Sequence, residues 1–394
     1  MFFSRSPLSR TRAAGAVCAG ALLLAVLSPG VGVGSQAPAT PEWVRLGEPI
    51  ASSDIPEGDR PYLVSWVKEH ARPAPDYLVD LFQRHDVVIL GEFHHVREHK
   101  ELVVDLLPRL YHEAGVRCLA WEFSPSSDNA RLARLTTGPE FDAEGLLELA
   151  RESVQWNSKS HWDFVEAVWR LNHGLAPGQQ PMRMIGLDSD WDPVNSYIAW
   201  KTKPEGSPER QRAAADGRAR DPHMARVVET EILGKGEKGL VFVGRGHDFT
   251  HHEFGPETDL GREIMGRLLY RKHGTRVFQV WLDRAMLGFV QGVDEEAGLR
   301  FVGFDLCDSP FASILSTRPN FVPDAPGVPL GRIARGYVDF GPRSALHANV
   351  TIEGFVTPEM FSQFKHYYEI DFERPFTNAA EVDTYLQAHR WPKP

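Results

Sequence analysis

Cysteine is scarce in this chain, and its pattern does not indicate a disulfide scaffold. The sequence contains three cysteines in 394 residues, and one of them, Cys18, lies in an apolar N-terminal run. Cys118 and Cys307 both sit in apolar, strand-like contexts, so we expect two buried thiols rather than one disulfide.

Basic runs and long apolar stretches are also missing from most of the chain. The formal net charge is −10, and a protein this acidic without a basic run is a poor candidate for binding nucleic acid. Beyond the N-terminal run, no segment is long and apolar enough to span a bilayer. We therefore expect neither a nucleic acid partner nor a stable membrane span.

Standard catalytic motifs are absent too. The sequence has no Gly-x-Ser-x-Gly elbow, no His-Glu-x-x-His, no phosphate-binding loop and no Cys-x-x-Cys pair. A serine hydrolase, a thermolysin-type protease and a nucleotide-dependent enzyme therefore have no support from motifs.

The first 37 residues have the pattern of a secretory signal peptide. Arginines precede an apolar run from Ala13 to Leu27, and a Ser-Gln-Ala sequence ending at Ala37 offers a cleavage site. The run is shorter than the ~20 apolar residues that a membrane span needs, which disfavours an uncleaved anchor. The sequence predicts an exported protein, periplasmic or extracellular.

From residue 74 onward, strand and helix patterns alternate. The predicted strands are 87–90, 116–121, 182–187, 240–243 and 277–282, and the predicted helices are 75–83, 97–114, 141–152, 162–172, 222–233 and 260–273. This alternation predicts an α/β fold in three layers, with a mostly parallel central sheet and helices on both faces.

The pattern divides the chain into four regions. We expect a signal peptide at 1–37, an N-terminal wrap at 38–73, an α/β core at 74–305 and a C-terminal extension or lid at 306–394. The last region is rich in proline and aromatic residues, with short β-like runs at 336–340 and 349–355.

Polar residues follow the predicted core strands. Glu92, His94 and His95 follow the first strand, Glu122 the second, Asp188 the third and His247 the fourth. The carboxyl ends of parallel strands lie along one edge of a sheet, so these side chains are expected to share a pocket. Buried carboxylates and imidazoles are costly unless they are paired or bind a metal, so packing alone does not explain them.

Two chemistries fit such a cluster. A Glu–His pair can hold and deprotonate a water molecule while a second carboxylate or histidine stabilises charge on the substrate. Alternatively, Glu92, His94, His95 and His247 hold a divalent metal such as Zn²⁺ or Mn²⁺, which lowers the pKa of its bound water.

Several of these residues also have a purely structural explanation. Glu122 and Asp188 each fit a helix cap or turn at a strand end. His99 lies one helical turn beyond His95 and is expected to be a solvated helix residue, although it stays a secondary candidate. His161 is expected at the surface or in packing.

Six short motifs, in order, resemble the erythromycin-esterase/ChaN-like superfamily, which also includes the Tiki/TraB-like proteins. They are Gly91-Glu92 with the following histidines, Trp121-Glu122, Trp162 through Asn172, Ile185 through Asp188, Arg220 through Ala225, and Gly244 through His247. The resemblance implies a parallel α/β core with one polar pocket. Its chemistry would be hydrolytic in the esterase branch, metal-dependent and proteolytic in the Tiki branch, or haem binding in the ChaN branch.

The resemblance also implies a set of site residues. Glu92, one of His94 and His95, Glu122 and His247 would be central, and Asp188 and Asp221 secondary. The esterase spacing selects His95 but expects a glycine where Val96 stands, whereas the ChaN-like spacing selects His94, so both remain open.

We therefore expect an exported hydrolase that acts on an ester, lactone or amide of a small molecule. The alternative is a haem- or divalent-metal-binding protein without catalysis, which the surplus of histidines near the strand ends favours. The sequence does not indicate the substrate or the oligomeric state.

Overall fold

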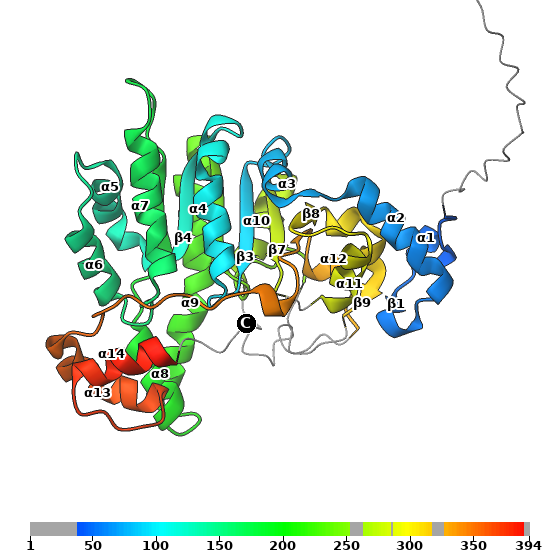
Figure 1. Cartoon of the computed structure of the whole chain (residues 1–394). Coiled ribbons are helices and arrows are strands. Elements are labelled where there is room, and N and C mark those ends of the chain that lie inside the picture. The colour runs from blue at the N-terminus through cyan, green and yellow to red at the C-terminus, as the bar shows by residue number, and fades with distance from the viewer. Residues whose placement is uncertain (1–37, 253–262, 285–286, 317–326, 390–394) are drawn as a thin grey trace, which may run out of the picture. The chain divides into compact units, whose positions relative to one another are not determined.

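An eight-stranded sheet forms the centre of the computed structural model (Figure 1). The structure describes residues 38–252, 263–284, 287–316 and 327–389. The predicted signal peptide lies outside the described residues, so export stays a prediction. Among the described residues, no helix has both the length and the apolar character needed to cross a membrane.

The central sheet is mostly parallel, as the sequence predicts. Strands β10, β7, β3, β6, β4 and β5 all run in the same direction, while β8 is antiparallel to β10 and β2. In spatial order the strands are β2 (Arg72–Pro73), β8 (Val302–Phe304), β10 (Gly336–Val338), β7 (Val277–Leu282), β3 (Val87–Glu92), β6 (Lys238–Gly244), β4 (Val116–Pro125) and β5 (Arg183–Asp188).

Helices account for most of the remaining structure. They are α1 (Glu42–Leu46), α2 (Arg60–His70), α3 (Ala74–Leu81), α4 (Arg97–His112), α5 (Asn129–Thr137), α6 (Ala143–Glu152), α7 (Lys159–His173), α8 (Pro193–Thr202), α9 (Pro208–Glu231), α10 (Met265–His273), α11 (Gly288–Glu296), α12 (Leu330–Ile333), α13 (Pro358–Asp371) and α14 (Ala379–Ala388). A short parallel pair, β1 (Ile50–Ala51) and β9 (Ile314–Leu315), lies outside the main sheet.

Alternating side chains of the strands build two apolar layers. In β3, Val88 and Leu90 pack in the cluster that includes α4 and α7. Val87 and Ile89 face the other way and pack with α9 and α10. Because successive residues of a strand point to opposite faces, one fully buried strand supports both layers. Figure 1 shows α4 and α7 on one side of the sheet and α9 and α10 on the other.

Two predicted elements differ from the structure. Helix α9 begins at Pro208 and continues through Pro222, where the sequence suggested a start. The side chain of Ser207 caps α9 by accepting the backbone N–H of Arg210, a favourable start that precedes the internal proline. The β-like run 349–355 forms no strand and makes only an isolated bridge, between Ser158 and Thr351.

The C-terminal segment contributes to the fold in two places. Strand β10 joins the main sheet between β7 and β8. Helices α13 and α14 lie beside α8, below the sheet in Figure 1. Cys118 and Cys307 are both free thiols; Cys118 is buried as predicted, whereas Cys307 is half-buried rather than buried.

Candidate functional site

Residues at or near the carboxyl ends of three neighbouring strands meet at the floor of one pocket. Glu92 ends β3 and is paired in the sheet with Gly244, the last residue of β6, while Glu122 lies on the neighbouring strand β4. The pocket has a volume of about 510 Å³. His94, Glu122 and His247 all line it, so the predicted convergence of strand ends is present in the structure.

A buried network fixes the first imidazole. Glu92 accepts a hydrogen bond from His94 Nδ1 through one carboxylate oxygen and forms an ion pair with Lys100 through the other. The Lys100 ammonium also donates to the backbone carbonyls of Phe93, His94 and Val96, at 2.9, 2.9 and 3.1 Å. Lys100 thereby holds both the carboxylate and the turn that carries His94.

Charge in this network shifts three pKa values. Burial opposes ionisation of Glu92, but Lys100 and His94 outweigh it and hold the pKa of the carboxyl well below its usual range. Burial lowers the pKa of Lys100, against the attraction of Glu92. Burial would also lower the pKa of His94, yet Glu92 and then Glu122 raise it above its ordinary value.

A second carboxylate fixes the other imidazole. Asp221 is fully buried on α9. Its carboxylate accepts hydrogen bonds from His247 Nδ1 and from the backbone N–H of Met265, each at 2.9 Å. The unusual continuation of α9 through Pro222 is what places Asp221 beneath His247. Asp221 is therefore a positioning residue for an imidazole of the pocket floor.

Glu122 lies between the two imidazoles. Its Oε1 is 3.5 Å from His94 Nε2, and its Oε2 is 3.4 Å from His247 Nε2. Gly244 makes this convergence possible, because a Cβ atom there would lie 2.4 Å from His94 Cε1 and 3.1 Å from Glu122 Oε1. The floor thus consists of the Glu122 carboxylate between two imidazoles, and each imidazole is hydrogen-bonded through Nδ1 to a second carboxylate.

The structure distinguishes the two adjacent histidines. His94 lines the pocket, whereas His95 Nε2 lies 2.6 Å from Arg284 Nη1 and does not line it. Burial and then Arg284 lower the pKa of His95 to about 4. Among the expected metal ligands, His95 is therefore placed with a different set of partners.

His99 is buried, and the expectation of a solvated helix residue is wrong. Its Nδ1 accepts the backbone N–H of Phe93 at 3.2 Å, and its Nε2 donates to the carbonyl of Asp283 at 3.0 Å. Burial and Lys100 lower the pKa of His99 to about 3. Both ring nitrogens are thus used to fix the β3–α4 connection to the end of β7.

Asp188 lines the pocket, and both of its carboxylate oxygens are hydrogen-bonded to neighbouring side chains. Its carboxylate accepts two bonds from Arg220 Nε, at 2.9 and 3.1 Å, one from Nη2 at 2.8 Å and one from Trp191 Nε1 at 3.0 Å. The Arg220 guanidinium also lies 4.6 Å from the centre of the Trp191 ring. This geometry supports the wall of the pocket.

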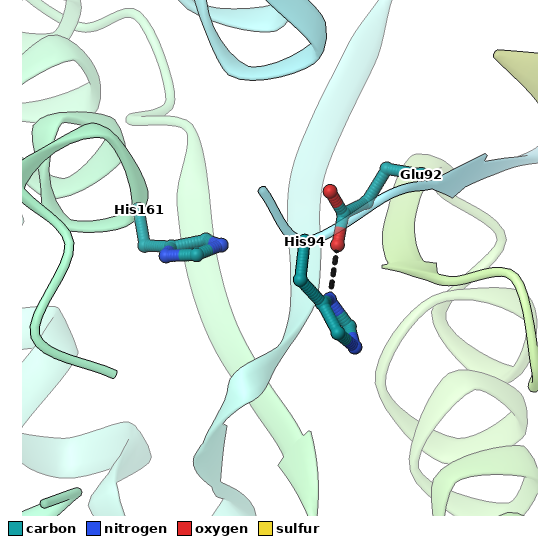
Figure 2. A group of neighbouring side chains, drawn as sticks. All are labelled: Glu92, His94 and His161. Atoms are coloured by element: carbon teal, nitrogen blue, oxygen red, sulfur yellow. Dashed lines mark hydrogen bonds and ion pairs between the residues drawn. The ribbon is translucent and has the colours of Figure 1, made fainter. Parts of the chain in front are cut away.

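Sequence reasoning missed two residues near the floor, Lys100 and His161. Both lie on apolar helix stripes: Lys100 precedes Val103 and Leu107 on α4, and His161 precedes Phe164, Val165 and Val168 on α7. A charged or imidazole side chain in an otherwise apolar stripe was the available signal. Figure 2 shows His161 directed from α7 toward the Glu92–His94 pair.

Aromatic side chains line much of the pocket away from its floor. Trp156 meets His94 edge to face, with ring centres 5.0 Å apart. Tyr197 of α8 meets Tyr367 of α13 in the same way, at 5.7 Å. The C-terminal helices therefore supply one wall, with Tyr367, Tyr368, Asp371, Phe372 and Leu386 among the lining residues.

The lining fits a haem poorly. Haem propionates call for cationic partners, and among the described lining residues the one lysine or arginine is Arg220, which Asp188 already binds. The Nε2 atoms of His94 and His247 lie 3.5 and 3.4 Å from the carboxylate oxygens of Glu122. The donor set supports a proton-transfer site more directly than a haem site.

No protein-family model matches the sequence, and no curated protein matches it. Among solved structures, a succinoglycan biosynthesis protein has a TM-score of 0.50 at 11% identity, covering 75% of this chain and 99% of that one. ChaN of Campylobacter jejuni with cofacial haem has a TM-score of 0.34 at 15% identity, covering 54% and 90%. A variant of the erythromycin esterase EreC in its open conformation has a TM-score of 0.37 at 12% identity, covering 52% and 72%. The first likeness concerns the fold alone, and the other two carry no conclusion about this chain's chemistry.

Proposed function

We propose that the protein is a hydrolase that cleaves an ester, lactone or amide of a small molecule bound in this pocket. One observation carries the proposal: His94 and His247, each held by a buried carboxylate, turn their Nε2 atoms toward Glu122 from two sides. Such a floor can take a proton from water and return it to a leaving group. The predicted signal peptide makes this, by the same proposal, an exported enzyme.

The two imidazoles take complementary roles in the proposed reaction. His94 donates its Nδ1 hydrogen to Glu92, so its Nε2 accepts the proton of a water molecule that attacks the substrate carbonyl. Glu122 orients that water. His247, whose Nδ1–H donates to Asp221, acts as an imidazolium in this step and donates its Nε2–H to the developing oxyanion.

Substitution of one supporting carboxylate and of one imidazole tests the proposal. We expect Glu92→Gln and His247→Ala each to lower kcat by ~10²-fold or more, the usual scale for acid–base and oxyanion groups. The assay is a panel of esters, lactones and amides with the protein purified free of metal and without a histidine tag. His112→Ala, at an exposed position on α4, is the control. Activity within threefold of the parent in both variants would refute the assignment.

The pH profile supplies a further test of the base. Glu92 and Glu122 hold the pKa of His94 above its ordinary value, so the imidazole keeps its proton to higher pH. A base must lose that proton, so kcat/KM should rise with pH, with a midpoint above about 6.5. Glu92→Gln removes the larger stabilising charge and should shift the midpoint of its residual activity to lower pH. A midpoint that does not move would exclude His94 as the base.

A further inference from the structure

His161 is a buried imidazole that the proposed reaction does not use. It is 2% exposed, and neither ring nitrogen has a hydrogen-bond partner among the described residues. Buried polar atoms are nearly always paired, so a histidine with two unpaired nitrogens calls for an explanation. Phe123 fixes the ring from one side, with ring centres 4.2 Å apart.

The unpaired imidazole lies against two other donors. One ligand atom each from Glu92, His94 and His161 all lie within 4.8 Å of one another. The three residues come from separate places: the end of β3, the turn that follows it, and α7. Figure 2 shows the His161 ring directed toward this pair from the opposite side.

We propose that Glu92, His94 and His161 form a binding site for a divalent transition metal such as Zn²⁺. Two imidazoles and one carboxylate are a donor set typical of zinc, and imidazole nitrogen disfavours Mg²⁺ and Ca²⁺. Donors around a tetrahedral zinc ion lie about 3.3 Å apart, given bonds of about 2.0 Å. The three donor atoms already lie within 4.8 Å of one another, so small side-chain rotations would bring them to that spacing.

The surroundings favour a cation at this position. Lys100 holds one oxygen of Glu92, which leaves the other oxygen to bind the ion, as hydrogen-bonded carboxylate ligands do in metal sites. Glu122 adds a second buried negative charge 3.5 Å from His94 Nε2, which balances the ammonium of Lys100. The ion would take the place of the hydrogen between Glu92 and His94.

Metal binding has a consequence that rests on the proposed function. An ion bound to His94 Nδ1 breaks the hydrogen bond from His94 to Glu92, which is the bond that orients the proposed base. Hydrolysis by the metal-loaded protein should therefore be slower than hydrolysis by the metal-free protein. The site would make the enzyme sensitive to transition metals.

Titration with Co²⁺ and Zn²⁺ tests the site directly. We expect the purified full chain to bind one equivalent of Co²⁺ with the visible absorption of a low-coordinate site, and Zn²⁺ to displace it. His161→Phe keeps a ring against Phe123 but offers no ligand atom, and should weaken binding roughly 100-fold or more. His85→Phe is the matched control, because His85 is another buried imidazole, stacked on Phe278 at 4.5 Å. Absence of binding by the parent, or equal binding by His161→Phe, would overturn the proposal.

Turnover separates this proposal from the proposed function. His161→Phe should retain the metal-free activity of the parent and lose its inhibition by Zn²⁺. Binding that depends on His161 in a protein that hydrolyses none of the panel would leave the metal site standing and remove the hydrolase. Hydrolysis without any metal binding would do the reverse.

Discussion

Replacing Lys100 with methionine should destabilise the protein by about 3–5 kcal/mol, because it leaves the Glu92 carboxylate buried without its cation. The Lys100 side chain is about 1% exposed and binds three backbone carbonyls besides Glu92. The three carbonyls lie in the connection from β3 to α4, which carries His94, so the loss should also disorder His94. Urea unfolding at pH 7 measures the first effect, and kcat for the best ester measures the second.

The double variant Lys100→Met/Glu92→Gln identifies the cause of that loss. A neutral amide has no unpaired charge to bury, so the double variant should recover part of the lost stability while remaining inactive. Lys238→Met is the control for the loss of a lysine that binds backbone carbonyls. Lys238 donates to the carbonyls of Phe82 and Ala114, at 2.6 and 3.4 Å. A loss below about 1 kcal/mol in Lys100→Met would contradict the central place of the ion pair.

Replacing Asp294 with asparagine should stabilise the protein at neutral pH. Asp294 lies on α11, is fully buried, and has no hydrogen-bond partner for either carboxylate oxygen among the described residues. Burial, followed by the charges of Asp339 and Asp283, raises its pKa to about 8. The folded protein therefore holds a proton here that the unfolded chain releases near pH 4.

The sign of the effect follows from that difference in proton binding. A raised carboxyl pKa contributes its full stability below about pH 4, and the contribution is lost as pH rises toward 8. Asparagine stays neutral throughout, so it does not lose stability in this way. The stability of the variant relative to the parent should therefore grow by about 2–3 kcal/mol between pH 5 and pH 7.

Chemical denaturation of both proteins at pH 5 and pH 7 provides the measurement. The relevant quantity is the difference between variant and parent, because other buried groups titrate equally in both. Asp54→Asn, at an exposed position, is the control, and its difference should stay near zero at both pH values. A constant difference for Asp294→Asn would show that this carboxyl does not change protonation between the two conditions.

Much of the fold is readable from the sequence because its strands are buried on both faces. Strand β7 has the predicted bounds. Strand β3 begins where predicted and runs slightly past its predicted end, to Glu92. The predicted start of helix α9 is wrong because a proline such as Pro222 usually marks the first turn of a helix. The first turns of this helix, which follow the cap at Ser207, show little hydrophobic periodicity. Strand β10 falls within the β-like run at 336–340, whereas β8 has three residues, too few for a periodic signal.

The candidate site divides in the same way. Glu92, Glu122 and His247 follow strands, and a parallel sheet brings such positions together whatever the sequence between them. The choice of His94 over His95 depends on the turn held by Lys100, a tertiary contact that spacing does not encode. Lys100 and His161 lie on helices, and which helical side chains reach a strand end depends on how the helices pack.

The C-terminal origin of the pocket wall has a consequence for the order in which the chain is made. The floor is complete in sequence at His247, whereas α13 and α14 are the last helices of the described chain. During synthesis, the residues of the floor therefore precede those of this wall. A chain that stops before Pro358 keeps the chemical groups of the floor but lacks the wall that α13 and α14 supply.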